Sequence, residues 1–191
     1  MTKIIGRAFT LFLVITIITG VIYPLAVTGI TALVFPTQAN GSLLYKNGKV
    51  IGSALIGQDF SDPKYFHGRP SAAGENGYDG TSSSGSNLGP TNKTLVNAVT
   101  ERANSVRVKN DLESVAPVPS DLVTASASGL DPHISPMAAS LQIARVAKAR
   151  NVSEYKVKTL VEKNTEKRQF GFLGEPRVNV LRLNLALDAL N

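Results

Sequence analysis

The sequence predicts a mixed α/β domain that lies outside the cytoplasm on a single amino-terminal transmembrane helix. An apolar run from Ala8 to Phe35 contains no charged residue, which is typical of a membrane span. After it, segments with helical spacing alternate with short apolar stretches and with loops rich in Gly and Ser. The chain contains no Cys, so disulfides cannot hold the outer domain together.

The apolar run is long enough to cross a bilayer as a helix. At about 1.5 Å of rise per residue, about 20 residues span the roughly 30 Å hydrocarbon layer. Backbone groups in lipid must satisfy their own hydrogen bonds, which favours a helix. A cleaved signal peptide is the main alternative, but its apolar stretch is only about 7–15 residues long. We therefore predict a retained span with a kink at Pro24, which lacks a backbone donor.

The charges around the span predict its orientation. Lys3 and Arg7 precede it, and no charged residue follows it before Lys46. Positive charge beside a membrane helix stays on the cytoplasmic side. We therefore expect a single-pass protein of the cell membrane with its main domain outside. The predicted parts are a cytoplasmic tail at residues 1–7, a transmembrane helix at 8–35 and a soluble α/β domain at 36–191.

A β-hairpin is predicted after a short polar connector at residues 36–42. Asn47-Gly48 separates residues 43–46 from residues 49–52, and Asn-Gly between two apolar stretches is the strongest short hairpin signal. From Gln58 to Pro90, many Gly and Ser residues predict a long loop. Four side chains are expected to pin this loop to a surface, namely Tyr65, Phe66, Tyr78 and Leu88.

The remainder of the outer domain is expected to be mostly helical. Ser135-Pro136 is typical of a helix start, with serine as the N-cap and proline in the first turn. Ser153 is a cap of the same kind for the next helix. The expected elements are helices at residues 91–108, 135–150 and 153–164, a short strand at 122–124, and a helix over the apolar ending at 178–190.

Composition excludes one class of partner and leaves others open. The formal net charge is +6, and the stretch from Arg145 to Arg168 is rich in Lys and Arg. Such a run is usually a solvated helix face, although it also suits anionic lipid head groups or an acidic partner. A nucleic acid is not expected, because the chain has no Trp, no recognised binding motif and no aromatic residues interleaved with the basic ones.

The sequence predicts no catalytic site, no metal site and no independently bound cofactor. The only histidines are His67 and His133, whereas a metal site needs three or more converging ligands. Asp131-Pro132 is typical of a turn in which His133 bonds locally. Ser84 would complete the residue types of a hydrolase with them, but no Gly-x-Ser-x-Gly elbow is present. A membrane-anchored hydrolase and a stand-alone extracellular binding module remain alternatives.

Signals for anion binding are weak. The chain has no P-loop motif, and turn geometry explains the serine-rich residues 83–87 as well as an anion would. Gln142, Arg145 and Lys148 fall on one face of a predicted helix. That face would suit an anion or an acidic partner, but a solvated surface is the commoner case.

Several long motifs in a fixed order resemble one protein family. They are residues 52–60, 65–72, 85–90, 121–134, 142–150 and 174–181. Together with the single amino-terminal span, they resemble the C subunit of the Kdp-type potassium-transporting P-type ATPase, the KdpC family, over nearly the whole chain. Ser84 departs from the pattern, because we expect glycine there in many relatives.

The resemblance implies a non-catalytic accessory subunit. Its partners in the bilayer would be a channel-like potassium-translocating subunit, a P-type ATPase catalytic subunit and a small membrane peptide. The chain would assemble or stabilise this complex and would act as a catalytic chaperone that raises the ATP affinity of the ATPase subunit. By motif match, Gln142 would be the residue that contacts ATP.

The predicted orientation conflicts with the contact to ATP. ATP is cytoplasmic, whereas Gln142 lies in the part that we place outside. We expect instead that the outer domain sits over the external mouth of the potassium-translocating subunit, where it steadies the complex or shapes ion entry. The carboxylates of the glycine-rich loop would either raise the local cation concentration or remain in a solvated loop; they are Asp59, Asp62, Glu75 and Asp79.

Overall fold

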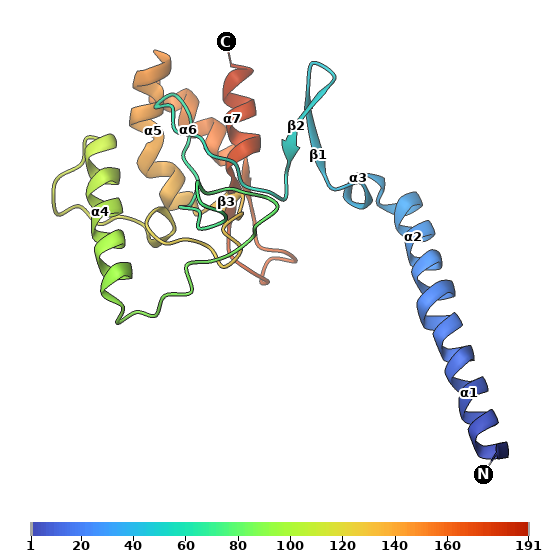
Figure 1. Cartoon of the computed structure of the whole chain (residues 1–191). Helices are drawn as coiled ribbons and strands as arrows, with labels where there is room; N and C mark the ends of the chain where they lie inside the picture. The colour runs from blue at the N-terminus through green and yellow to red at the C-terminus, as the bar shows by residue number, and fades with distance from the viewer. Residues whose placement is uncertain (1, 191) are drawn as a thin grey trace. The chain divides into compact units, whose positions relative to one another are not determined.

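The structure, a computed structural model, describes residues 2–190 and divides into two compact units, Met1–Ser53 and Ala54–Asn191. One long helix makes up most of the first unit (Figure 1). Its parts are α1 (Thr2–Ile17), a π-helical turn (Ile18–Ile22) and α2 (Tyr23–Val34). The widened turn ends two residues before Pro24, which cannot donate a backbone hydrogen bond and whose ring crowds the preceding turn.

The amino-terminal helix is long and apolar enough to cross a membrane. It covers 33 residues from Thr2 to Val34, and its most apolar window is not buried by any other part of the chain. Three of its threonine hydroxyls donate to backbone carbonyls of the preceding turn, those of Thr10, Thr19 and Thr31, at 2.8 to 3.0 Å. These three hydroxyls therefore keep a partner in an apolar environment. The predicted apolar helix is confirmed, whereas the boundaries at residues 1–7, 8–35 and 36–191 stay predictions.

The first unit ends in the predicted β-hairpin. β1 (Leu43–Lys46) pairs antiparallel with β2 (Lys49–Ser53). At the turn, Asn47 and Gly48 have φ angles of 52° and 74°, the left-handed conformation that an Asn-Gly hairpin turn requires. The connector before it differs slightly from expectation, because it contains a short helix, α3 (Pro36–Ala39).

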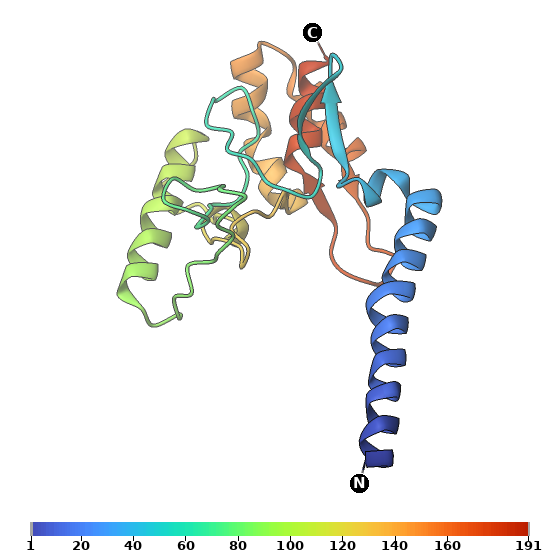
Figure 2. The ribbon, with the colours of Figure 1, turned by 45° about the vertical axis from the view of Figure 1, so that its right-hand side comes forward.

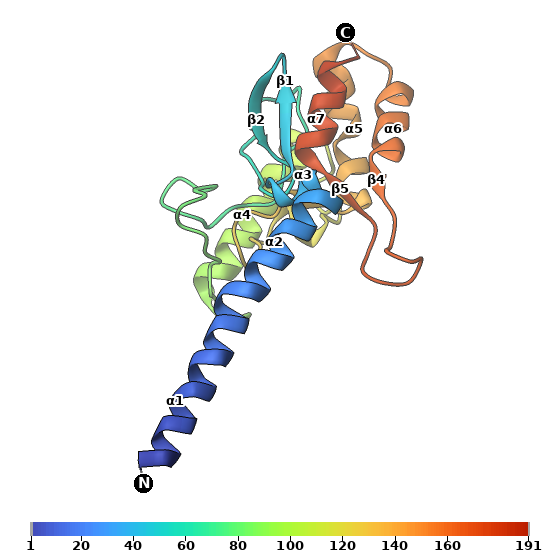
Figure 3. The same ribbon diagram turned by 90° about the vertical axis from the view of Figure 1, so that its right-hand side faces the viewer.

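The core of the second unit is formed by three helices and a small antiparallel sheet. The helices are α5 (Pro136–Arg150), α6 (Glu154–Lys163) and α7 (Val180–Asp188). The strands lie in the order β3 (His133–Ile134), β5 (Arg177–Asn179) and β4 (Thr165–Glu166). Figure 3 shows α6 and α7 beside β4 and β5. The fully buried side chains of this core include Phe66, Val146, Val157, Val178, Leu183 and Leu187.

Capping residues set the starts of these helices, as predicted for two of them. Ser135 accepts from the amide of Ala138, and Ser153 accepts from that of Lys156. The predicted helix over residues 178–190 is correct only from residue 180. Asn179 caps α7 through its side chain, and the residues before it pair as β5 with both neighbouring strands.

The predicted helix near residue 100 is confirmed as α4 (Lys93–Lys109), with Asn92 as its N-cap. Figure 2 shows it at the edge of the second unit, with coil between it and α5. The strand predicted at residues 122–124 is wrong. Residues Ser120–Leu122 form a 3-10 turn, in which Val123 N donates to Ser120 O at 3.1 Å, and Thr124 N and Oγ1 bond to the same oxygen at 2.9 and 2.8 Å. This turn buries Leu122 without extending the chain.

The glycine-rich stretch forms the predicted long loop, and among the described residues no helix or strand lies between β2 and α4. Phe66 anchors it with no exposed surface, and Tyr65 and Tyr78 are half-buried. Leu88 does not anchor it, because its side chain is 36% exposed. The loop passes close to other backbone at Gly129, which has φ +67°, and an added Cβ there would lie 2.5 Å from Ser84 O.

Candidate functional site

Two side-chain amides hydrogen-bond to the backbone of consecutive residues of the long loop, and we call each such pair of bonds an amide grip. Gln142, on α5, accepts from His67 N at 2.8 Å through Oε1 and donates to His67 O at 3.1 Å through Nε2. Asn184, on α7, makes the same pair of bonds with Phe66: its Oδ1 accepts from Phe66 N at 2.8 Å, and its Nδ2 donates to Phe66 O at 3.0 Å. Both amides are buried, at 1% and 2% exposure. Each amide therefore satisfies the donor and the acceptor of one loop residue, as a neighbouring β-strand would.

Arg145 extends this grip towards the start of the loop. Its guanidinium donates to Gln142 Oε1 at 2.7 Å, to Tyr65 O at 3.0 Å and to Pro63 O. Its Nε donates to Asn110 Oδ1 at 3.0 Å, which links α5 to the end of α4. Burial lowers the pKa of Arg145 to about 10, so the group stays charged near neutral pH.

The predicted helix face divides into two parts. Gln142 and Arg145 contact the loop rather than solvent, whereas Lys148 is exposed and pairs with Asp111 at 3.3 Å. Only the last of the three side chains is therefore on the solvated surface that we expected for the whole face.

His67 is uncharged in this surrounding. Burial lowers its pKa to about 4, and the nearby positive charge of Arg145 acts in the same direction. Its Nε2 lies 3.3 Å from Asp62 O. The imidazole is therefore neutral at neutral pH.

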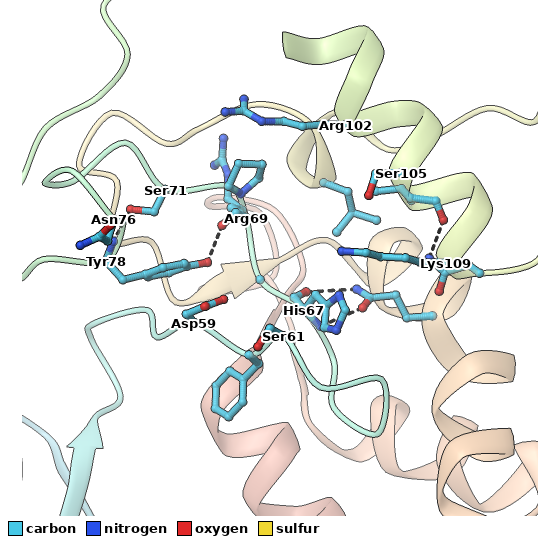
Figure 4. Close-up of a pocket in the computed structure, with 18 residues that line it drawn as sticks. Asp59, Ser61, His67, Arg69, Ser71, Asn76, Tyr78, Arg102, Ser105 and Lys109 are labelled. Carbon is cyan, nitrogen blue, oxygen red and sulfur yellow. Dashed lines mark hydrogen bonds between the residues drawn. The ribbon is translucent and has the colours of Figure 1, made fainter.

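A cavity of about 310 Å³ lies between α4, the long loop and Gln142 (Figure 4). Figure 4 shows Arg102 and Lys109 reaching from α4 toward the loop, which contributes Arg69 and Tyr78. Asp59 is the only acidic residue in the lining. The positive side chains and the small volume would suit a small anion better than a cation.

Arg69, in the cavity wall, bonds to the segment between α4 and α5. Its Nη1 pairs with Asp131 Oδ2 at 3.1 Å, and its Nη2 donates to Thr124 O and Ala125 O. Arg102 donates to the adjoining carbonyl, Val123 O, at 3.2 Å. Burial by itself would raise the pKa of Asp131, but hydrogen bonds from His133 and Arg69 outweigh it and lower that pKa.

The residues of the hydrolase alternative serve the fold. Ser84 Oγ donates to Ala72 O at 2.8 Å. Asp131 Oδ1 accepts from His133 N at 3.0 Å, which is the local bond predicted for this turn. Within residues 2–190, no three or more His, Cys, Asp or Glu side chains converge in a way that could hold a metal.

The four carboxylates of the loop have separate surroundings. Asp59 lines the cavity, Asp62 pairs with Lys64 at 3.2 Å, and Asp79 accepts from Thr81. Glu75 is exposed. Hydrogen bonds from neighbouring residues lower the pKa of Asp62 and of Asp79, so both stay charged.

Sequence reasoning missed Asn184, Arg69 and Arg102. Asn184 had a visible signal, since it is a polar residue inside the apolar ending Val180–Leu187 and needs a partner once buried. The two arginines had none, because only the folded loop brings them to one cavity.

The comparisons with known proteins agree with the motifs. Residues 5–189 match the family model described as KdpC, K+-transporting ATPase, c chain. The chain belongs to the KdpC family. Two relatives are each named Potassium-transporting ATPase KdpC subunit. That of Methylococcus capsulatus is 61% identical over 96% of both chains, and that of Dechloromonas aromatica is 55% identical over 100% of both.

A third KdpC relative, from Mycobacterium tuberculosis, is 59% identical over 96% of both chains. KdpC is a subunit of a potassium-transporting ATPase complex, so the chain has partner subunits in the membrane. This favours the subunit over the stand-alone binding module and the hydrolase. The contact between Gln142 and ATP stays a prediction.

Proposed function

We propose that this KdpC chain is a non-catalytic accessory subunit that assembles or stabilises the ATPase complex from the outer side of the membrane. The observation that carries the proposal is that polar groups inside the domain bond to the chain's own backbone. The buried amides of Gln142 and Asn184 and the half-buried guanidinium of Arg145 are all engaged in holding the chain's own loop. Such a domain is braced as a rigid body, and a rigid body suits a structural role in a complex.

The orientation belongs to this proposal. Lys3 and Arg7 precede the apolar helix, and positive charge favours the cytoplasmic side. The second unit then faces outward, where it sits over the external mouth of the channel-like potassium-translocating subunit. The P-type ATPase catalytic subunit and the small membrane peptide complete the assembly.

Raising the ATP affinity of the ATPase subunit is a second candidate function. It is supported by the position of Gln142 beside a cavity with Arg102 and Lys109, whose positive charges suit phosphate groups. Two points speak against it: both ends of the Gln142 amide already bond to His67, and cytoplasmic ATP does not reach a domain that faces outward.

Co-purification tests the accessory role. A full-length chain with a carboxyl-terminal tag, solubilised in mild detergent, should bring down the other subunits, identified by mass. The proposal fails if the tagged chain purifies alone while the remaining subunits still assemble and take up potassium as efficiently as before.

Protease accessibility tests the orientation separately. External protease added to sealed, right-side-out cells should remove the carboxyl-terminal tag. Full protection of the tag, with cleavage only after the membrane is opened, would place the second unit inside and revive the contact with ATP.

A further inference from the structure

A short turn with an apolar tip connects β4 to β5, and we call residues 167–176 the finger. Figure 3 shows it extending from the ends of these strands. Gln169 and Leu173 bond to each other in both directions at 2.9 Å, and they form an isolated β-bridge. Between them, Phe170 and Gly171 have φ angles of 52° and 83°. The tip therefore has a defined hairpin-like conformation.

The side chains at the tip are apolar and face solvent. Phe170 is 87% exposed, Phe172 70% and Leu173 47%. Phe66, in the same unit, has no exposed surface. A non-glycine residue with positive φ is also uncommon, and Phe170 adopts that conformation at the tip. Adjacent exposed aromatic side chains on a rigid support are typical of an interaction site.

Most of the charges at the base of the finger are in ion pairs. Arg168 donates to both carboxylate oxygens of Glu175, at 2.8 and 2.7 Å. Glu166 accepts from Arg177 Nε at 2.9 Å. Arg182 also pairs with Glu166, at 3.6 Å, and Lys167 adds a further positive charge. Three of the four basic residues at the base are therefore in ion pairs, and the pair of Arg168 with Glu175 joins the two sides of the finger.

We propose that the finger docks into an apolar groove on a neighbouring subunit of the potassium-transporting ATPase. This inference rests on the accessory role proposed above. A preorganised tip loses little conformational entropy when it enters a groove of fixed shape. Attachment to anionic lipid would instead draw on a cluster of unpaired positive charges, whereas the three arginines at the base of this finger are already in ion pairs with Glu166 and Glu175.

Site-specific photocrosslinking in cells tests the docking. A benzoylphenylalanine placed at Phe172 of the full-length chain, expressed with its partner subunits, should form an adduct with another subunit of the complex. The same probe at Tyr155, an aromatic residue on α6 that is 78% exposed, is the matched control and should form much less of that adduct.

Three outcomes separate this inference from the accessory role. Adducts at Phe172 with lipid alone, or no adduct in a complex that co-purifies intact, would overturn the docking and leave the accessory role standing. A chain that co-purifies with no other subunit at all would defeat the accessory role itself.

A pair of substitutions gives a second measurement. The double variant Phe170→Ser, Phe172→Ser should weaken retention of the partner subunit by about 30-fold, as expected for loss of an aromatic anchor. Tyr155→Ser should retain it. Because the replaced rings are exposed, the thermal unfolding midpoint should not change. Unchanged retention in the double variant would contradict the proposal, and a misfolded variant would leave the crosslink as the deciding result.

Discussion

Gln142 holds the backbone of His67 by both of its polar groups, accepting from N at 2.8 Å and donating to O at 3.1 Å. The two residues come from distant parts of the chain, one on α5 and the other in a loop without helix or strand. A side chain thus supplies the hydrogen bonds that secondary structure would normally supply. The loop can therefore keep one conformation beside the cavity of the second unit.

Replacing Gln142 by Leu should destabilise the second unit by about 2 kcal/mol, because His67 N and O lose buried partners. Thermal unfolding of the detergent-solubilised full chain, followed by far-UV circular dichroism, measures the change. Gln169→Leu is the control, since that residue is exposed. A Gln142→Leu chain that keeps its stability but loses any effect on ATP affinity would favour the nucleotide contact instead.

The two amide grips should act as one unit. Asn184→Leu should cost about 2 kcal/mol for the same reason, since Phe66 N and O lose their partner. The double variant with Gln142→Leu should cost less than the two single changes together, because either change already frees the same segment of loop. Strict additivity in the same unfolding assay would show that the two grips are independent.

His67 should make the domain less stable in mild acid. Its pKa is about 4 in the folded chain, below the ordinary value of 6.5. The unfolded chain therefore binds more protons between these values, and stability falls as the pH drops from 6.5 toward 4. His67→Asn should flatten this part of a plot of unfolding midpoint against pH.

The carboxylates provide an internal comparison for the pH experiment. Asp131 has a lowered pKa, so its stabilising effect is lost only as the pH falls below the ordinary carboxyl range. His67→Asn should not change the loss of stability that protonation of Asp131 causes at lower pH. A variant whose whole profile coincides with that of the parent chain would show that His67 does not cause the loss above pH 4.

Gly129→Ala should be strongly destabilising, by about 2 kcal/mol or more, because φ is +67° and the added Cβ would lie 2.5 Å from Ser84 O and 2.7 Å from Ala73 N. Gly80→Ala is the matched control, since nothing lies within 4 Å of its Cβ position. Equal unfolding midpoints for the two variants would mean that the close approach of the loop at Gly129 is not needed for stability.

The finger shows where sequence reasoning stopped. Its Gly171 and Gly174 predict a break in the chain, but local pattern does not say whether the neighbouring phenylalanines are buried. Phe66 and Phe172 are equally apolar and both lie in loops, yet the first is fully buried and the second is 70% exposed. The difference depends on whether Asn184 and the core reach that loop, which is a tertiary relationship.

The sequence by itself determined the features that depend on neighbouring residues. The uncharged run gave the apolar helix, Asn47-Gly48 the hairpin, and Ser135 and Ser153 the starts of two helices, because caps, turns and periodicity act over a few residues. The order of the sequence motifs indicated the KdpC family. Only the tertiary structure decided that Gln142 and Arg145 hold a loop and that Arg69 and Arg102 share a cavity. Those contacts join segments far apart in the chain, and the need to pair these polar groups arises from burial, which no local pattern records.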